Sequence, residues 1–293
     1  MGGTVGVIIK KESGEQIGMA RWTNVMPYFF TRFELFYGKP EDWLKEFSAE
    51  WLNMKADYEK NKDTENYEFG MTSVYFPHDN LCPREYGLIA VDLKNRKIYS
   101  SQDYCNIGDL ATYHILGRHD DNIENTEIKK YFDNGLLKKF KFYDIEHRVE
   151  KQVDITSLSF EEIITFLKEL GSSRIKEFSH PLFANYTKEN LDFYTTSFLL
   201  DTDWKFSIYH DRNFGLLKIR KEMEEDGFIF NKSDDKEWKD YLSYSFCNLN
   251  DLELKTDEEY KNFKELYLEI FKEEHIVNNI DIELENRSIK SNC

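Results

Sequence analysis

Residues 4–22 read TVGVIIKKESGEQIGMARW, a pattern that is typical of a β-hairpin. Thr4 to Ile9 is rich in β-branched residues, and Gln16 to Trp22 continues with a second run of strand-forming residues. The polar segment Glu12-Ser13-Gly14-Glu15 lies between the two runs and contains the glycine that a turn favours. We therefore predict that the chain begins with two antiparallel strands.

Further hairpins are predicted along the chain. Tyr86 to Gln102 contains two apolar runs around a turn at Lys94 to Lys97. A third hairpin is expected to pair Trp204–Tyr209 with Phe214–Ile219. Single strands are also predicted at residues 138–142, which alternate with a period of two, and at residues 147–155.

Amphipathic helices are expected between these strands. Pro40 favours a helix start, and Trp43, Phe47, Trp51 and Met54 follow at helical spacing as one apolar stripe. Capping boxes predict further helix starts at Ser159 and Thr256. Helices are also predicted over residues 106–116, 124–132 and 187–199. Hairpins mixed with helices, without a regular βαβ alternation, predict an α+β fold of antiparallel, hairpin-rich sheets packed with amphipathic helices.

The length of 293 residues fits one large domain or two domains of ordinary size. Where two domains are assumed, the boundary is expected near residues 145–157. This division gives an N-terminal α+β domain over residues 1–150 and an acidic C-terminal α+β domain over residues 151–293.

The chain combines a large excess of acid with many aromatic residues. It has 55 Asp and Glu against 39 Lys and Arg, a net charge of −16, while Phe, Trp and Tyr make up 16% of its residues. The aromatic content argues against a disordered chain, and the charge argues against direct binding to phosphate backbones. The segment from Lys221 to Cys293 holds 20 acidic and 10 basic residues, so the imbalance is greatest there.

The N-terminus lacks the basic and apolar regions of a signal peptide, and no run approaches the ~20 apolar residues of a membrane span. The four cysteines are widely spaced and form no CxxC pair. These features predict a cytoplasmic protein with free thiols, no membrane partner and no cofactor.

Three acidic clusters, with aromatic residues nearby, suggest a surface that binds another protein. Complementary charge speeds docking, and Trp and Tyr are frequent interface anchors. We therefore expect a non-catalytic protein that covers a basic, nucleic-acid-binding surface, in its sharpest form a phage-type inhibitor of a host nuclease or defence complex. The residues expected to contact this partner are Glu222, Glu224, Glu225, Asp226, Asp234, Asp235, Glu237, Trp238 and Tyr241.

Two alternatives stay open. Asp79, followed by Asp92-Leu93-Lys94, resembles the acid and acid-x-lysine pattern of PD-(D/E)xK nucleases, in which the acids would hold Mg²⁺ and the lysine would help to activate water. The segment His119-Asp120-Asp121 is a second candidate metal corner for a hydrolase. The other alternative is a small-molecule binding module whose aromatic residues stack on a ligand. The chain contains no GxSxG, P-loop or GxGxxG motif that would favour a particular enzyme class.

Overall fold

The structure of the chain is a computed structural model, which describes residues 4–22, 32–45, 56, 60, 75–77, 80–101, 109–111, 127–209, 212–247 and 257–272. The chain forms two compact units that are interleaved along the sequence. Unit 1 consists of Met1–Thr23, Asn53–Tyr104 and Lys205–Cys293, and unit 2 consists of Asn24–Leu52 and Cys105–Trp204. The boundary predicted between residues 150 and 151 falls inside strand β8 (Val149–Asp154) of unit 2.

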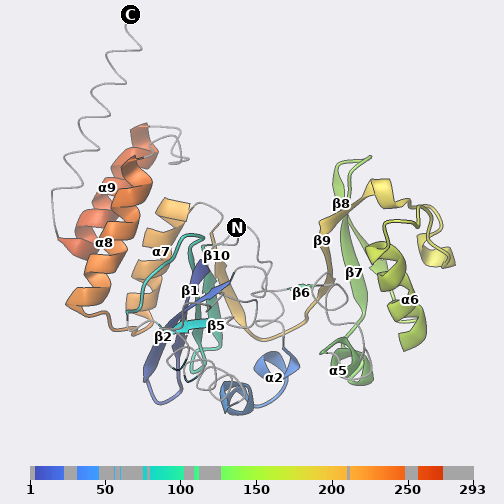
Figure 1. Cartoon of the computed structure of the whole chain (residues 1–293), viewed down its shortest axis with the longest axis horizontal. Coiled ribbons are helices and arrows are strands. Elements are labelled where there is room, and N and C mark those ends of the chain that lie inside the picture. The colour runs from blue at the N-terminus through green and yellow to red at the C-terminus, as the bar shows by residue number, and fades with distance from the viewer. Residues whose placement is uncertain are drawn as a thin grey trace, which may run out of the picture. The chain divides into compact units, whose positions relative to one another are not determined.

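Unit 1 is built on a six-stranded mixed sheet with the strand order β10-β5-β4-β1-β2-β3 (Figure 1). β1 pairs with β4, and β10 with β5, in parallel, and the other neighbours are antiparallel. The predicted hairpins over residues 4–22 and 86–102 are confirmed as β1–β2 and β4–β5. The strands of the sheet are β1 (Thr4–Lys10), β2 (Gln16–Trp22), β3 (Tyr75–Pro77), β4 (Leu88–Asp92), β5 (Lys97–Ser100) and β10 (Lys205–Ile208).

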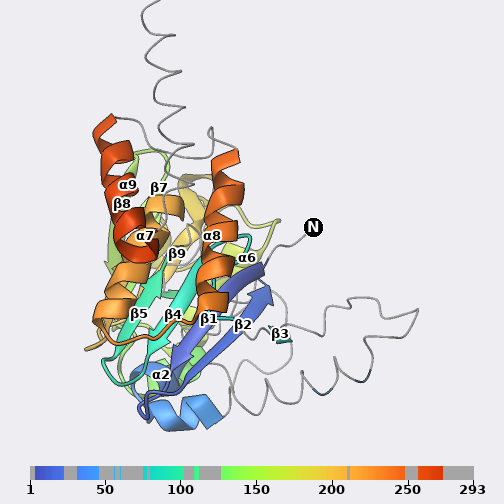
Figure 2. The ribbon, with the colours of Figure 1, turned by 90° about the vertical axis from the view of Figure 1, so that its left-hand side faces the viewer.

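Three helices cover one face of this sheet (Figure 2): α7 (Arg212–Glu225), α8 (Lys232–Cys247) and α9 (Asp257–Phe271). They pack their apolar side chains against Ile8, Leu88, Ala90 and Tyr99 of the sheet. The side chains of Val7, Ile9, Ile89, Val91 and Ile98, which alternate with these along the strands, are buried as well. Both faces of the central strands are therefore buried, as is usual where parallel strands pair.

Two glycines allow close approaches in unit 1. A Cβ atom at Gly6 would lie 2.2 Å from the carbonyl oxygen of Cys82, so β1 accepts the neighbouring loop only because Gly6 has no side chain. A Cβ atom at Gly215 would lie 2.6 Å from the Cβ atom of Tyr209, which lets α7 pack tightly against the end of β10.

The hairpin predicted from Trp204–Tyr209 and Phe214–Ile219 is wrong in its second half. The first segment forms β10, but the second lies inside α7. A short apolar run fits either a strand or a buried helix. A helix suits this segment better than a strand, because helical spacing places the buried residues on one side. These residues are Leu216, Leu217, Arg220 and Met223.

Unit 2 contains a four-stranded antiparallel sheet with the order β6-β9-β7-β8. Its strands are β6 (Asp109–Ala111), β7 (Lys139–Asp144), β8 (Val149–Asp154) and β9 (Leu191–Leu199). The strands predicted at residues 138–142 and 147–155 are thus confirmed. The helical elements are α2 (Phe33–Phe36), α5 (Glu127–Asp133), α6 (Phe160–Gly171), η3 (Pro181–Phe183) and η4 (Lys188–Asn190).

The core of unit 2 is aromatic. Phe140 of β7 meets Phe166 of α6 edge to face, and Phe166 stacks on Phe183 with ring centroids 3.8 Å apart. The capping box predicted at Ser159 begins α6, where the Ser159 side chain accepts a hydrogen bond from the backbone N–H of Glu162. This capping box fixes the first turn of the helix that closes the core.

Two helices predicted in unit 2 are strands in the structure. Residues 191–199 form β9, because a segment rich in Phe, Tyr and Thr finds partners on both sides, in β7 and β6. Within the predicted helix 106–116, residues Asp109–Ala111 form β6. The helices predicted over 124–132 and from Thr256 are confirmed as α5 and α9, and the α+β class is confirmed.

A helix also begins at Pro40, as predicted, and runs to residue 45, where the described segment ends. Trp43 in this helix is buried. The remaining members of its predicted stripe, Phe47, Trp51 and Met54, lie outside the described residues.

Candidate partner-binding surface

All seven acidic residues predicted to bind a partner lie in unit 1, in α7, in α8 and in the connection between them. Several of them have cationic partners within the chain. Lys97 Nζ lies 3.0 Å from Glu222 Oε2 and 2.9 Å from Asp226 Oδ2. Tyr209 donates its hydroxyl to Glu222, and Tyr99 donates to Asp226. These two carboxylates therefore fasten the end of α7 to β5 and β10.

Charge and burial shift the pKa values in this network. Burial alone would raise the pKa of Glu222 and Asp226, but hydrogen bonds and the nearby Lys97 ammonium outweigh it and hold both pKa values below their usual range. The hydrogen bond to Glu222, with burial, raises the pKa of Tyr209 to about 12. Burial and the Asp226 carboxylate raise the pKa of Tyr99 as well.

A second cation, Lys10, is buried at the same end of the strands, as the last residue of the central strand β1. Its Nζ is 3.1 Å from Asp92 Oδ2 and also donates to the backbone carbonyl of Asp226. Lys10 is 6% exposed and Asp92 is fully buried. Asp92 also accepts two hydrogen bonds from Asn95 in the β4–β5 turn. The ion pair thus joins the ends of two parallel strands to the end of α7.

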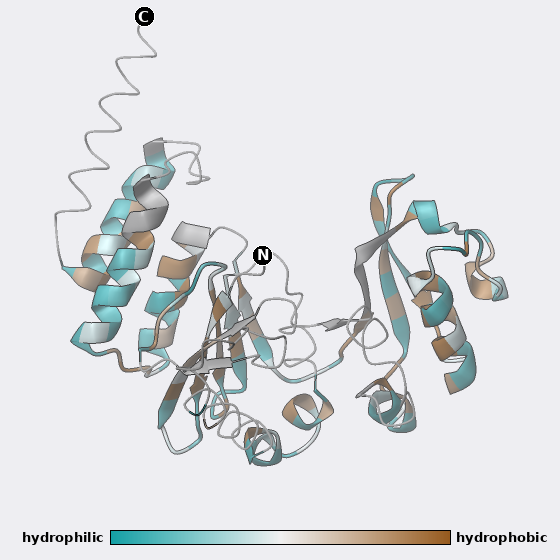
Figure 3. Ribbon diagram, in the orientation of Figure 1, coloured by the Kyte–Doolittle hydropathy of each residue, from teal (hydrophilic) through white to brown (hydrophobic). Residues whose placement is uncertain are grey.

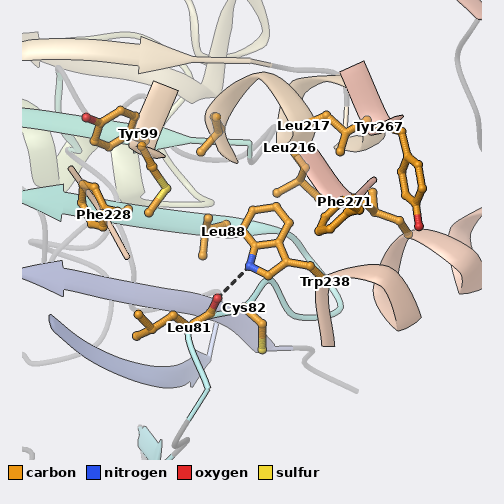
Figure 4. Packing of buried hydrophobic residues seen from close by; sticks show 14 of the residues in the cluster. Leu81, Cys82, Leu88, Tyr99, Leu216, Leu217, Phe228, Trp238, Tyr267 and Phe271 are labelled. Carbon is orange, nitrogen blue, oxygen red and sulfur yellow. Dashed lines mark hydrogen bonds between the residues drawn. The ribbon is translucent and has the colours of Figure 1, made fainter. Parts of the chain in front are cut away.

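Asp234 and Trp238 support the fold of α8. One oxygen of Asp234 accepts the backbone N–H of Asn231 at the helix start, and the other accepts that of Leu81 at 2.7 Å. Trp238 is fully buried and donates its indole N–H to the Leu81 carbonyl at 2.7 Å (Figure 4). Because neither side chain reaches the surface, neither is available to a partner, which corrects the sequence-based expectation for both.

Arg220 organises the carboxylates that stay at the surface. Its side chain is 3% exposed. The guanidinium donates to Glu224 Oε1 at 2.9 Å and to Asp235 Oδ1 at 2.6 Å, and it lies 3.5 Å from the centre of the Phe230 ring. The Glu224 and Asp235 side chains are 39% and 36% exposed. The second oxygen of each accepts no hydrogen bond from the described residues. Arg220 therefore fixes two carboxylates that still face solvent.

The connection between α7 and α8 carries an exposed isoleucine. Ile229 is 75% exposed, more than any other large hydrophobic residue in the described part of the chain. Its backbone N–H donates to Gln16 Oε1 at 3.1 Å, and its carbonyl accepts from Gln16 Nε2 at 2.8 Å. Figure 3 shows this connection as a short hydrophobic stretch beside the largely hydrophilic α8. We call Glu224, Glu225, Ile229 and Asp235 the clasp surface.

The other predicted partner residues lie on the same helices. Glu225 is exposed, whereas Glu237 and Tyr241 are half-buried. Tyr241 donates to the backbone carbonyl of Glu85 at 3.4 Å. The sequence analysis did not select Arg220, Ile229 or Gln16. The hydrophobic triplet at 228–230, within an acidic segment, was the signal that could have drawn attention to this connection.

Of the residues proposed for a hydrolase, the structure describes Asp92 and Lys94. Asp92 is buried in its ion pair with Lys10, while Lys94 is exposed in the following turn. Asp79, His119, Asp120 and Asp121 lie outside the described residues. Within the described segments, no three His, Cys, Asp or Glu side chains are grouped to hold a metal ion.

Cys82 is a buried free thiol beside α8. Burial, with the nearby Glu237 and Asp234 carboxylates, raises its pKa to about 12. Because the thiolate is the reactive form, this cysteine is a poor nucleophile at neutral pH.

Comparison with protein-family models, with curated proteins and with solved structures gives no match to this chain. None of the helices within the described segments has the length and hydropathy that crossing a bilayer requires.

Proposed function

We propose that the chain is a non-catalytic binding protein whose clasp surface docks onto a basic surface of another protein. The observation that carries this proposal is the position of Arg220. It lies almost completely inside the fold, yet it holds Glu224 and Asp235 at the surface with more than a third of each side chain exposed.

Fixed carboxylates favour binding in two ways. A side chain that is already ordered loses less conformational freedom when a partner binds, so less binding energy is lost to ordering. One guanidinium faces two carboxylates here, which leaves an excess of negative charge beside the exposed Glu225. Such a surface attracts cations and, with a chain charge of −16, increases the rate of encounter with a basic partner.

The partner class follows from the same charge argument. Proteins that grip nucleic acid carry basic surfaces that neutralise phosphates. An acidic protein with rigid carboxylates suits such a surface as a competitor for the nucleic acid. We therefore propose inhibition of a nucleic-acid-handling protein, such as a nuclease or defence complex, as the role of the clasp surface.

The test is affinity capture with the full chain, compared with a variant of the clasp surface. The combination Glu224→Gln, Glu225→Lys and Asp235→Asn removes negative charge but keeps acceptors for Arg220. Thermal unfolding of this variant checks that the buried Arg220 charge, which then has no counter-ion, leaves the chain folded. Glu265→Lys on α9, where the side chain is 65% exposed, is the matched control. We expect basic proteins to bind the wild type and the control in low salt and to be lost with the triple variant.

Raising the salt provides the second readout. At 1 M salt the Debye length falls to about 3 Å, so captured proteins should be released. Capture that is equal for the wild type and the triple variant, or that does not weaken in salt, would contradict the proposal.

A further inference from the structure

The exposed Ile229 is held more rigidly than a surface side chain requires. Its backbone N–H and carbonyl both bond to the Gln16 side chain, which is 213 residues away in the sequence. Gly227 precedes it with φ of +81°, a conformation that glycine adopts easily. Phe228 is buried beside Tyr99, and Phe230 lies against Arg220. Both neighbours are thus anchored in the fold, while Ile229 points away from it.

This arrangement has no evident benefit for stability. An apolar side chain that is 75% exposed gains little from leaving water on folding. The same rigid presentation is useful for binding, because a fixed apolar side chain enters a pocket with a small loss of conformational freedom. Binding energy at interfaces is concentrated in such anchors, surrounded by polar contacts.

The residue next to Ile229 connects it to the charged part of the clasp surface. Phe230 lies under the Arg220 guanidinium, and the same guanidinium holds Glu224 and Asp235. The apolar anchor and the two carboxylates are therefore fixed by one cluster of contacts. A partner that binds Ile229 would bring its own neighbouring groups close to these carboxylates.

We propose that Ile229 is the anchor of the clasp surface and inserts into an apolar pocket of the partner protein that is bordered by lysine or arginine side chains. This inference rests on the proposed function and adds the chemistry of the partner's contact site.

The experiment uses a phage-displayed library of random linear peptides, selected on the full wild-type chain without counter-selection. The binding of each selected peptide is then measured on Ile229→Asp and on the triple variant Glu224→Gln/Glu225→Lys/Asp235→Asn. We expect the selected peptides to combine Leu, Phe or Trp with nearby Arg or Lys. Ile229→Ala should weaken their binding about tenfold or more, because a buried apolar side chain is lost. Gln16→Ala should raise the dissociation rate, because it frees the backbone of Ile229.

Ile145→Asp is the matched control, because Ile145 is an exposed isoleucine of unit 2, at 48% exposure. This variant should bind the peptides as the wild type does. Thermal unfolding of the Ile229 variants should match that of the wild type, because the side chain makes few contacts in the fold.

The outcomes separate the two proposals. Peptides whose binding needs Glu224, Glu225 and Asp235 but not Ile229 would overturn the anchor and leave the proposed function standing. Peptides that need Ile229 but contain no basic residues would overturn the proposal that lysine or arginine side chains surround the partner's pocket. They would also overturn the proposed function. Failure to select any peptide that depends on Ile229 would overturn the anchor. A wild-type dimer that Ile229→Asp dissociates would identify a second copy of this chain as the occupant, and would overturn the proposal that Ile229 binds a basic partner protein.

Discussion

Three cations, Lys10, Lys97 and Arg220, organise the acidic residues near the end of α7. Lys10 and Arg220 are almost completely buried. Lys10 contacts the Asp92 carboxylate and the Asp226 carbonyl, and Arg220 contacts the carboxylates of Glu224 and Asp235. Removing one member of a buried pair leaves an uncompensated charge, which is far more costly than the pair itself is favourable. At the scale of single residues, much of the acidic character in this region serves the fold.

Trp238 provides a test of this view. Trp238→Phe removes the donor to the Leu81 carbonyl, and we expect the free energy of unfolding to fall by about 1–3 kcal/mol for the unmet hydrogen bond. The smaller ring should add about 1 kcal/mol for lost packing. Urea unfolding measures the change. An interface role without a structural role would instead leave the stability unaltered.

Tyr241→Phe is the control for this substitution, because it lies one turn away and its hydrogen bond to Glu85 is exposed. Its effect should stay within about 0.5 kcal/mol. If Tyr241→Phe is as destabilising as Trp238→Phe, α8 tolerates no aromatic substitution. The loss of stability in Trp238→Phe could then not be assigned to its buried hydrogen bond.

At the scale of elements, Asp234 joins the start of α8 to the segment before β4. Asp234→Ala leaves the backbone N–H groups of Leu81 and Asn231 without their acceptor. We expect a loss of about 2 kcal/mol or more in the free energy of unfolding, since buried donors without partners are costly. Asp240→Ala, an exposed change on the same helix, should stay within about 0.5 kcal/mol. Equal effects would argue against this role of Asp234.

Local sequence patterns correctly predicted the elements that are stabilised by residues within the same short segment. The β1–β2 hairpin has its own turn, and α6 has its own capping box, so short segments of sequence contain the necessary information. β9 was predicted as a helix because its strand partners, β6 and β7, come from elsewhere in the chain. The segment Phe214–Ile219 of α7 was predicted as a strand because a short apolar run does not distinguish a strand from a buried helix.

The candidate site depends on contacts between residues that are even farther apart in the sequence. The sequence analysis found the acidic residues Glu224 and Asp235, but charge counts do not show which carboxylates an internal cation holds. Arg220 lies just before them in the sequence, and its burial follows only from the packing of α7 in the folded unit. The hydrogen bonds between Gln16 and Ile229 join residues that are 213 positions apart in the sequence, which no local pattern reveals.

At the scale of the whole molecule, the net charge of −16 opposes compaction, and internal ion pairs relieve part of that repulsion in unit 1. These pairs also make stability depend on pH. The pKa values of Glu222 and Asp226 are lower in the folded chain than their ordinary values of 4.5 and 3.8. Their contribution is therefore present above those values and is lost as the pH falls below them.

The alkaline side has the opposite sign and supplies the sharper test. The pKa of Tyr209 rises from 10.0 to about 12 on folding, so its neutral hydroxyl contributes stability below pH 10 that is lost as the pH rises toward 12. Tyr99, whose pKa is also raised, acts in the same direction. Urea midpoints measured from pH 7 to pH 12 should fall steeply for the wild type and less steeply for Tyr99→Phe/Tyr209→Phe. If the two curves stay parallel above pH 10, the carboxylate–tyrosine bonds do not fasten α7 to the sheet, and the rigid base on which the clasp surface depends is absent.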